Sequence, residues 1–365
     1  MPPIDIPALL ASDTFDVSFG VFCGEPACLI QPNDIKSKFN IENLHLRSCV
    51  TDTSGHIISQ GFTKFFNYTE KPDLYPDPNK YNDWIFLNKE DGSTCVCDYH
   101  NNIFSMRTRG QFNYEKMENK EEFDILPAKY PKLIDFIKRD GGQHSFLLEM
   151  TTPNNRIVLY YTEVNFTLLA VINKTTLQYL SFKETKEIAE ECGIKTPEIF
   201  EFKNKSLPEI SAAVKEWKGK EGVVLCYNNY QNRLKIKSDD YLFKHRIKGK
   251  LNSTENLIDF FISKGCPGYG DFVDIITTEI DYETSQELRG SISKLIDAHK
   301  ETQNIISGME SFINSTNSLT RKDFAARVLS SYGTTNRASF VFTLKDRKVL
   351  SADNIKKLLF QALKK

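Results

Sequence analysis

The sequence predicts an α+β protein in two parts, a sheet-rich part over residues 1–245 and a mainly α-helical part over residues 246–365. Short β-branched or aromatic segments, bounded by turn residues, dominate the first part. Segments whose apolar residues repeat with a helical period dominate the second part. The first part lacks the regular alternation of strands and helices that a doubly wound parallel sheet requires. We therefore expect antiparallel sheets with flanking helices there.

Strand-like composition recurs along the first part. The segments are VSFGVFC (17–23), WIFLN (84–88), STCVCDY (93–99), SFLLEM (145–150), RIVLYY (156–161), TLLAVIN (167–173), GVVLCYN (222–228) and RLKIKS (233–238). Helices are predicted for KYPKLIDFIKRD (129–140), for TLQYLSFKETKEIAEECG (176–193) and around residues 207–217, the first two ended by glycines.

The second part carries helical patterns with Ser or Thr positioned as N-caps. They are TENLIDFFISKG (254–265), TSQELRGSISKLIDAHKETQNIISGMESFIN (284–314), TRKDFAARVLSSY (320–332) and SADNIKKLLFQALKK (351–365). ASFVFTL (338–344) is the one strand signal that remains there. Residues 321–365 hold eleven Lys or Arg against three Asp. Such a basic tail is either a solvated helix face or a surface that follows a phosphate backbone.

Composition excludes several classes of protein. With 40% hydrophobic and 26% charged residues, the 365-residue chain resembles an ordinary soluble protein, and its formal net charge of -1 gives no overall attraction for nucleic acid. The eight cysteines form no CxxC pair, which favours free thiols in a reducing cytoplasm over zinc sites or disulfides. No apolar run approaches the ~18 residues of a membrane span, and the first residues lack a secretory signal pattern.

The last predicted hairpin, KEGVVLCYNNYQNRLKIKSDDYL (220–242), gathers charge on one strand face. At a period of two, Arg233, Lys235 and Lys237 share a face, and Glu221 opens the neighbouring strand. Lysines so placed repel one another unless an anion lies between them. The pattern indicates either an exposed strand face or a triphosphate site, where cations neutralise a transferring phosphate.

The stretch NKEDGS (88–93) also has two interpretations. It is either a common Asp-Gly hairpin turn or a loop that presents Lys89 as a nucleophile. A nucleophilic lysine must lose its proton, and we expect Lys235 and Lys237 to lower its pKa if they face the same pocket. Gly92 would let the backbone approach a ligand closely.

The order of these motifs resembles the covalent nucleotidyltransferases, which comprise DNA ligases, RNA ligases and mRNA capping enzymes. KEDGS is followed by RTRG, FLLEMTTPNNRIVLYY, KEGVV and LKIKS. Within that superfamily, KEDGS, the block LHLRSCVTDTSGHIISQGFTKFFNYTE (44–70) with its KFFN element, EGVV and KIKSDDY resemble the RNA ligase 1 family of T-even bacteriophages. The resemblance covers residues 40–245 and implies a nucleotidyltransferase domain over residues 1–245.

The resemblance implies roles for the nucleotide-binding residues. Lys89 would attack the α-phosphate of ATP and form a lysyl-AMP. Arg47 and Lys64 would contact the triphosphate or pyrophosphate, and Glu149 would lie near the ribose. From the sequence alone, Glu149 at the end of a buried-looking strand needs a partner, and Asn154, Asn155 and Arg156 could supply one instead.

The resemblance also implies roles around the reacting phosphates. Glu221 would lie near the metal as well as the phosphates, while Lys235 and Lys237 would bind the α-phosphate. Arg109 stands where the family often has a functional lysine, a change that keeps the charge but alters its geometry. The further candidates are Glu90, Gly92, Phe66 and Tyr241. For Phe66 and Tyr241, a role in the core is an equal alternative.

The resemblance therefore implies an ATP-dependent RNA ligase that joins 5′-phosphate and 3′-hydroxyl RNA ends through a lysyl-AMP and an RNA-adenylate. The resemblance implies Mg²⁺, with Mn²⁺ as an alternative, a monomer, and a host-cell cytoplasm if the source is viral. Repair of cleaved tRNA by the helical domain, residues 246–365, is a role to test. The alternatives are a DNA ligase, a capping guanylyltransferase, or a non-catalytic RNA-binding protein on a ligase fold. The first two normally carry a β-barrel OB domain downstream, where this chain predicts helices.

Overall fold

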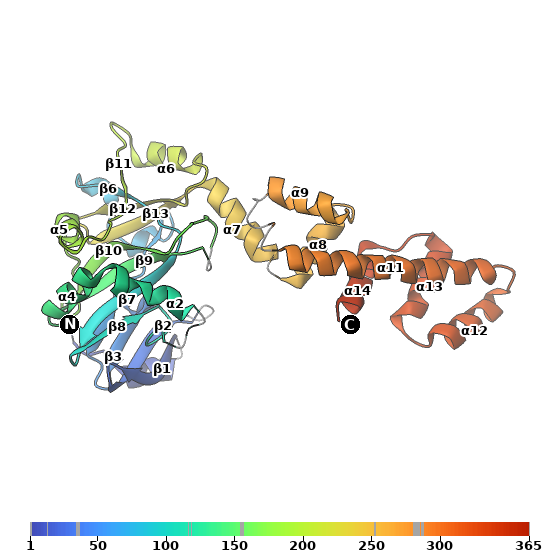
Figure 1. The fold of residues 1–365 in the computed structure, drawn as a ribbon, viewed down its shortest axis with the longest axis horizontal. Helices are drawn as coiled ribbons and strands as arrows, with labels where there is room; N and C mark the ends of the chain where they lie inside the picture. The colour runs from blue at the N-terminus through green and yellow to red at the C-terminus, as the bar shows by residue number, and fades with distance from the viewer. Residues whose placement is uncertain are drawn as a thin grey trace. The chain divides into compact units, whose positions relative to one another are not determined.

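The computed structural model of the chain divides into two compact units, residues 1–243 and 244–365 (Figure 1). It describes residues 2–12, 14–33, 37–115, 117, 119–153, 157–251, 253–279, 285 and 288–364, without the side chains of residues 246–250 and 279. The first unit contains three sheets with flanking helices, and the second is built from helices. The predicted α+β class, with antiparallel sheets followed by a helical region, is confirmed.

The first sheet is a four-stranded antiparallel sheet in the order β1-β2-β3-β4. Its strands are β1 (Phe15–Phe22), β2 (Glu25–Pro32), β3 (Cys49–Asp52) and β4 (Ile57–Gln60), with α1 (Ile6–Ser12) before them and the short 3-10 helix η1 (Leu44–Arg47) before β3. The sequence pattern predicted β1 only. β3 and β4 have four residues each, and the polar residues Thr51, Ser59 and Gln60 occupy buried positions in them.

The second sheet is antiparallel in the order β10-β9-β7-β8. Its strands are β7 (Ser93–His100), β8 (Ile103–Arg107), β9 (His144–Thr151) and β10 (Asn165–Asn173). The helices α2 (Lys120–Phe123), α3 (Ile125–Lys129), α4 (Pro131–Arg139) and α5 (Phe182–Cys192) belong to the same apolar core, in which Ile137, Phe146 and Leu148 are fully buried. Ser181 caps α5 by a capping box with Glu184, which explains why the helix starts later than the predicted residue 176.

The third sheet has the order β11-β6-β12-β13-β5, with β5 parallel to β13 and the other pairs antiparallel. Its strands are β5 (Phe66–Asn67), β6 (Ile85–Asn88), β11 (Ile199–Phe200), β12 (Gly222–Tyr227) and β13 (Asn232–Lys237), with α6 (Leu207–Lys215) packed against them and the 3-10 turns η2 (Pro72–Leu74) and η3 (Pro78–Lys80) nearby in sequence. The hairpin predicted over residues 220–242 is present as β12 and β13.

The NKEDGS stretch connects two different sheets. β6, which ends at Asn88, pairs with β11 and β12, whereas β7, which begins at Ser93, pairs with β8 and β9. Because β6 and β7 do not pair with each other in these ladders, the hairpin-turn interpretation of this stretch is wrong. Lys89 instead lies at the crossing from the third sheet to the second.

Two further predictions of local structure are wrong. In RIVLYY, the described residues 157–159 form bends and residues 160–161 are irregular, because the backbone N–H groups of Val158 and Leu159 donate to the carboxylate of Asp91 in place of a neighbouring strand. ASFVFTL lies in a helix, α13 (Asn336–Arg347), where Ala338, Val341 and Leu344 recur at a helical spacing and are buried.

Helices make up the described part of the second unit. They are α8 (Thr254–Ser263), α9 (Tyr269–Glu279), α11 (Arg289–Ser315), α12 (Arg321–Tyr332), α13 and α14 (Ala352–Leu363); α7 (Asp239–Leu251) runs across the boundary between the units. Ser253, Thr320 and Ser351 accept backbone N–H groups as N-caps of α8, α12 and α14. Among the described helices, none has the length and apolar character to cross a membrane.

Candidate active site

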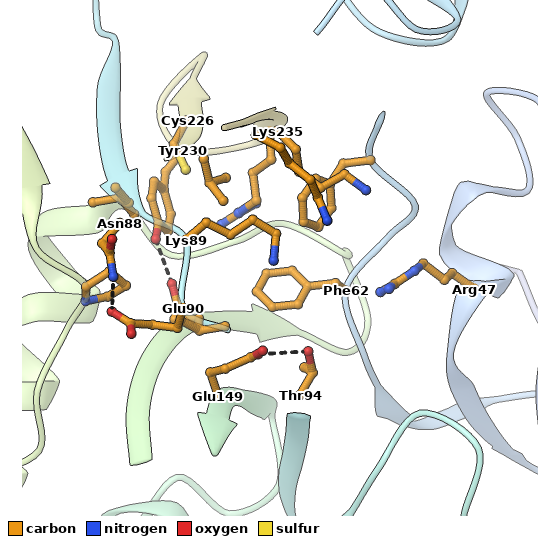
Figure 2. Close-up of a pocket in the computed structure, with 17 residues that line it drawn as sticks. Arg47, Phe62, Asn88, Lys89, Glu90, Thr94, Glu149, Cys226, Tyr230 and Lys235 are labelled. Carbon is orange, nitrogen blue, oxygen red and sulfur yellow. Dashed lines mark hydrogen bonds between the residues drawn. The ribbon is translucent and has the colours of Figure 1, made fainter. Parts of the chain in front are cut away.

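An open pocket of ≈ 850 Å³, which includes space open to solvent, is lined by both the second and the third sheet. Its apolar lining consists of Phe62, Phe65, Leu87, Leu169, Pro197, Val224, Cys226 and Tyr230, and its charged lining of Arg47, Lys89, Glu90, Glu149, Arg233, Lys235 and Lys237. Figure 2 shows the amine of Lys89 pointing toward the middle of the pocket, between Lys235 and Glu149. Aromatic and aliphatic walls combined with a cluster of cations suit a ligand that has both a flat ring and phosphates.

Glu221 lies between two of the lysines. Its Oε2 accepts a hydrogen bond from Lys89 Nζ at 2.9 Å, and its Oε1 forms an ion pair with Lys237 Nζ at 2.8 Å. The Glu221 side chain is only 2% exposed. The fold therefore brings together residues 132 positions apart, because β12, which follows Glu221, pairs with β6, which precedes Lys89.

The expected lowering of the Lys89 pKa is wrong for the ligand-free protein. Burial acts to lower this pKa, but the carboxylates of Glu221 and Glu149 act more strongly in the opposite direction, and the pKa of Lys89 is raised. Lys237 does not reverse this effect, because it is itself paired with Glu221. Lys89 is therefore an ammonium in the resting state and must lose a proton before it can act as a nucleophile.

Lys235 has a different environment. Among the described residues no carboxylate lies within ion-pair distance of it, and its ammonium lies 5.2 Å from the centre of the Phe65 ring. Burial, followed by the charges of Lys64, Lys89, Arg47 and Lys237, lowers the pKa of Lys235 to about 8. A bound anion would reduce this repulsion. We therefore expect a phosphate to stabilise the ammonium of Lys235 more than that of any other lysine that lines the pocket.

Glu149 lies on β9, next to the loop of residues 89–92 that contains Lys89. Its Oε1 accepts from the backbone N–H of Gly92 at 3.2 Å and its Oε2 from the hydroxyl of Thr94 at 2.9 Å. A Cβ on Gly92 would lie 2.2 Å from the carbonyl oxygen of Met150, so the close approach of the β9 backbone requires a glycine at this position. The sequence pattern instead predicted that Gly92 allows the close approach of a ligand. Asn154, Asn155 and Arg156, the alternative partners of Glu149, lie outside the described residues.

Burial raises the pKa of Glu149 to about 7, which makes stability depend on pH. Because the folded state binds this proton more tightly than the unfolded chain does, the associated stability is complete below pH 4.5 and is lost as the pH rises through 7. We expect Glu149→Gln to gain about 2.5 kcal/mol in the free energy of unfolding, relative to the unmodified protein, between pH 5 and pH 8. Urea unfolding at both pH values measures this difference, with the exposed Glu163→Gln as control. Parallel pH dependences of Glu149→Gln and the unmodified protein would contradict the assignment.

The two predicted triphosphate contacts, Arg47 and Lys64, and the candidate Arg109 lie in three different places. Arg47, at the end of η1, lines the pocket and enters it from the side opposite Asn88 and Glu90 (Figure 2). Lys64 lies between the rings of Phe39 and Phe66, at 5.4 and 5.5 Å, and lines a neighbouring smaller pocket. Arg109 is exposed and outside the pocket lining. Burial and then the charge of Arg109 lower the pKa of Arg47, so Arg109 acts on the pocket through its field.

The two phenylalanines of the KFFN element have different environments, and Phe66 takes the core position that the sequence left open for it. Phe66 is buried in β5 beside β13, whereas Phe65 lines the pocket. Pairing in β5 fixes which of two consecutive side chains faces the ligand side, and the short element could not be placed from the sequence. Glu90 does line the pocket, where its Oε1 accepts from the Asn88 amide at 2.7 Å.

Asp91 is a site residue that the sequence reasoning missed. It is 3% exposed, and its carboxylate accepts from Val158 N at 2.8 Å, Leu159 N at 2.6 Å and the hydroxyl of Tyr241 at 2.8 Å. Tyr161 accepts in turn from the backbone N–H of Asp91 at 3.2 Å. Asp91 therefore fastens the loop of residues 89–92 to two segments that are distant in sequence. Its position in an Asp-Gly pair had suggested only a turn residue.

Arg233 was placed correctly on the face of Lys235 and Lys237 but received no role. Its guanidinium carbon lies 3.8 Å from the centre of the Tyr179 ring and 4.3 Å from that of Tyr230, in a buried part of the pocket lining. Cation–π contacts offset part of the cost of burying this charge. Its Nη2 has no hydrogen-bond partner among the described residues.

The charged lining of the pocket fits a metal ion bound jointly by a carboxylate and a phosphate ligand. In the described part of the chain, no group of three or more His, Cys, Asp or Glu side chains is arranged to bind a metal ion by itself. Mg²⁺ is commonly held by one or two carboxylates together with water and phosphate oxygens. The donors present fit that kind of site, with Glu221 as the carboxylate closest to Lys89.

Comparison with known proteins gives a family and several similar structures. A protein-family model described as RNA ligase matches residues 45–251. The chain is similar to an archaeal ATP-dependent RNA ligase (form 2), with a TM-score of 0.49 and 14% identity over 78% of this chain and 74% of that chain. For a Naegleria gruberi RNA ligase with PPi the TM-score is 0.39, with 16% identity over 45% of this chain and 52% of that one. For a mutant of that ligase with ATP and Mn the TM-score is 0.43, with 14% identity over 66% and 82%.

The chain spans about half the length of the Naegleria ligase solved with PPi, at 52%. The family match covers more than half of this chain and includes every motif from Arg47 to Tyr241. It confirms the predicted resemblance to RNA ligases: the chain belongs to the RNA ligase family.

Proposed function

We propose that the chain is an ATP-dependent RNA ligase that joins 5′-phosphate and 3′-hydroxyl ends through a lysyl-AMP at Lys89. The observation that carries this proposal is the amine of Lys89 within a pocket that also contains Arg47, Lys235 and Lys237. An amine beside other cations that could neutralise phosphate charge is what a lysine nucleophile for an α-phosphate requires. Membership of the RNA ligase family supports RNA as the substrate, and apolar walls beside the cations suit a nucleoside triphosphate.

The proposed reaction has three phosphoryl transfers. Lys89 Nζ, after losing a proton, attacks the α-phosphorus of ATP, so that an N–P bond forms and the bond to pyrophosphate breaks. An oxygen of the RNA 5′-phosphate then attacks the same phosphorus, and the N–P bond to Lys89 breaks. Finally the 3′-hydroxyl attacks the 5′-phosphate of the RNA-adenylate, and AMP leaves.

The residues of the pocket would have different roles in the first step. Lys235, Lys237 and Arg47 would neutralise negative charge on the α-phosphate and the leaving pyrophosphate. Glu221 holds the Lys89 amine in place, and this ammonium must lose its proton before attack. A divalent cation, Mg²⁺ or Mn²⁺, would add positive charge at the phosphate oxygens. The apolar walls would enclose the base, and Glu149 lies where it could accept from a ribose hydroxyl.

Labelled nucleotides test the proposal. The protein is incubated with α-labelled ATP or GTP and Mg²⁺, then chased with 5′-phosphorylated single-stranded RNA, cleaved tRNA or nicked duplex DNA. We expect a labelled protein from ATP, transfer of the label to RNA, a joined RNA product, and loss of all three when the metal is chelated. Absence of any adduct would support a non-catalytic RNA-binding protein.

The same experiment separates the rival enzymes. A GTP adduct would indicate a capping guanylyltransferase, and preferential sealing of nicked DNA would indicate a DNA ligase. The described residues of the second unit form helices, without the β-barrel that those two classes normally carry at this place. That observation favours RNA joining.

We also propose that residues 246–365 contribute to the choice of RNA, with cleaved tRNA as the first substrate to compare. The support is the excess of basic over acidic residues in 321–365, which suits a phosphate backbone. The relative rates on cleaved tRNA and on unstructured RNA of the same end chemistry, measured with the whole chain, test this role. Equal rates would contradict it.

Lys235 should make nucleotide binding depend on pH. With a ligand-free pKa of about 8, its ammonium is present below pH 8 and is lost above it. We expect the affinity for a non-hydrolysable ATP analogue to fall by up to about tenfold from pH 7 to pH 9, and Lys235→Met to remove most of this slope. Titration calorimetry measures both. Lys183→Met, a change at an exposed lysine, should keep the slope, and an unchanged slope in Lys235→Met would contradict the prediction.

A further inference from the structure

A cluster of buried charges lies in the first unit and takes no part in the reaction proposed above. Asp98 on β7, Arg107 at the end of β8 and Lys174 after β10 are 0%, 0% and 7% exposed. Lys174 Nζ lies 3.8 Å from Asp98 Oδ1 and donates to the carbonyl of Ile58 on β4 at 3.1 Å. Replacing buried charges by apolar side chains is frequently neutral or stabilising. Stability alone therefore does not account for this cluster, and its geometry indicates another use.

The guanidinium of Arg107 joins the second sheet to the first. Its Nε donates to Ser59 Oγ at 2.6 Å and its Nη2 to the Ser59 carbonyl at 3.3 Å, both on β4. Its Nη1 donates to Ser48 Oγ at 3.0 Å, and its Nη2 also reaches the Ser48 carbonyl at 3.4 Å. The planar fork of donors in arginine suits such a multiple attachment, which a lysine could not reproduce.

Ser48 is held from a second direction as well. Its carbonyl accepts the backbone N–H of Gly61 at 2.7 Å, and its hydroxyl donates to the carbonyl of Arg109 at 3.4 Å. A Cβ on Gly61 would lie 2.8 Å from the Cβ of Ser48, so the two backbones are in close contact. Residue 48 is thus fixed by β8 on one side and by the segment after β4 on the other.

Arg47 immediately precedes Ser48 and reaches the pocket from the side opposite Asn88 and Glu90 (Figure 2). It comes from η1, the 3-10 helix directly before β3 of the first sheet, whereas Lys89 follows a strand of the third. The placement of the Arg47 guanidinium relative to Lys89 therefore depends on how the first sheet is attached to the second. Arg107 supplies that attachment at the residue next to Arg47.

We propose that Arg107 is a positioning residue, which acts through Ser48 to hold Arg47 where it binds the triphosphate end of the nucleotide. This inference rests on the proposed function, since it uses lysyl-AMP formation as its readout. Arg107 makes no contact with the reacting groups in this proposal. Its loss should weaken the binding of ATP and leave the chemical step of Lys89 nearly unchanged.

Single-turnover formation of lysyl-AMP at increasing ATP concentration tests the proposal. For Arg107→Met we expect the half-saturating ATP concentration to rise at least about tenfold, with the limiting rate within about threefold of the unmodified protein. Ser48→Ala removes the hydrogen bond between Arg107 Nη1 and Ser48 Oγ with little change in side-chain size. This milder variant tests the proposal even if Arg107→Met does not fold. It should raise the half-saturating concentration about threefold to fivefold.

A double-mutant cycle with Arg47→Ala separates positioning from general destabilisation. If Arg107 and Ser48 act through Arg47, then Ser48→Ala should have almost no further effect on half-saturation in the Arg47→Ala protein. Thr185→Ala is the control for loss of a buried hydroxyl, because Thr185 lies on α5, is fully buried, and its hydroxyl has no hydrogen-bond partner among the described residues. It should leave half-saturation unchanged.

Two results would overturn the inference: an equal effect of Ser48→Ala with and without Arg47, or unchanged half-saturation in both Ser48→Ala and Arg107→Met. Failure of the proposed function looks different, because the unmodified protein itself would then form no adduct with ATP.

Discussion

Lys89→Ala is expected to form no labelled protein from α-labelled ATP, a loss of at least about 1,000-fold in adduct formation at every pH. The variant lacks the amine that the fold holds between Lys235 and Glu149, and no neighbouring lysine can replace it. Lys237 is held by its ion pair with Glu221. Lys235 lies on β13, away from the segment that carries Lys89, so its amine would approach the α-phosphate from a different direction. Gel analysis of the labelled protein measures the effect directly.

Two further measurements make the Lys89 result specific. Non-covalent binding of ATP should persist in Lys89→Ala, because Arg47, Lys235 and Lys237 remain. Joining of RNA that already carries a 5′-adenylate should also persist, since its nucleophile is the RNA 3′-hydroxyl. Lys183→Ala, at a surface lysine paired with Glu187, should label normally. An adduct in Lys89→Ala would sink the assignment of the nucleophile.

Much of this pocket could be predicted from the sequence, because several of its charged residues alternate with apolar residues in segments that have a clear strand pattern. GVVLCY and RLKIK have the apolar alternation and turn residues of a hairpin, so the shared face of Lys235 and Lys237 followed from a period of two. The partner of Lys89 was harder to predict. Hydrogen bonds between β6 and β12 bring Glu221 to it, and a local pattern carries no information on which strands pair.

Two of the missed strands share a physical cause, which is buried polarity. The strands β3 and β4 place Thr51, Ser59 and Gln60 inside, where a strand pattern requires apolar residues. Ser59 occupies that position because Arg107 and Asp98 bond to it. The same holds for Asp91, which looked like a turn residue because its partners come from segments far away in sequence.

The resting state of Lys89 leads to the second large prediction, made for Glu221→Gln. We expect adduct formation at pH 7 to fall about 100-fold, because the amide cannot accept from both lysines and the Lys89 amine is no longer fixed. The remaining activity should also respond differently to pH. Since the Glu221 carboxylate raises the pKa of Lys89, its removal lowers that pKa, and the rise in rate that accompanies deprotonation should move to lower pH.

The pH profile distinguishes this explanation from a simple loss of structure. A partly unfolded variant would lose rate at all pH values alike, whereas removal of the carboxylate moves the rising limb of the profile toward acid. Glu187→Gln, which breaks a surface pair with Lys183 by the same chemical change, should alter neither the rate nor the profile. A Glu221→Gln profile with the rising limb at its original pH would contradict the view that Glu221 keeps Lys89 protonated, and with it the requirement that ligand binding must release this proton.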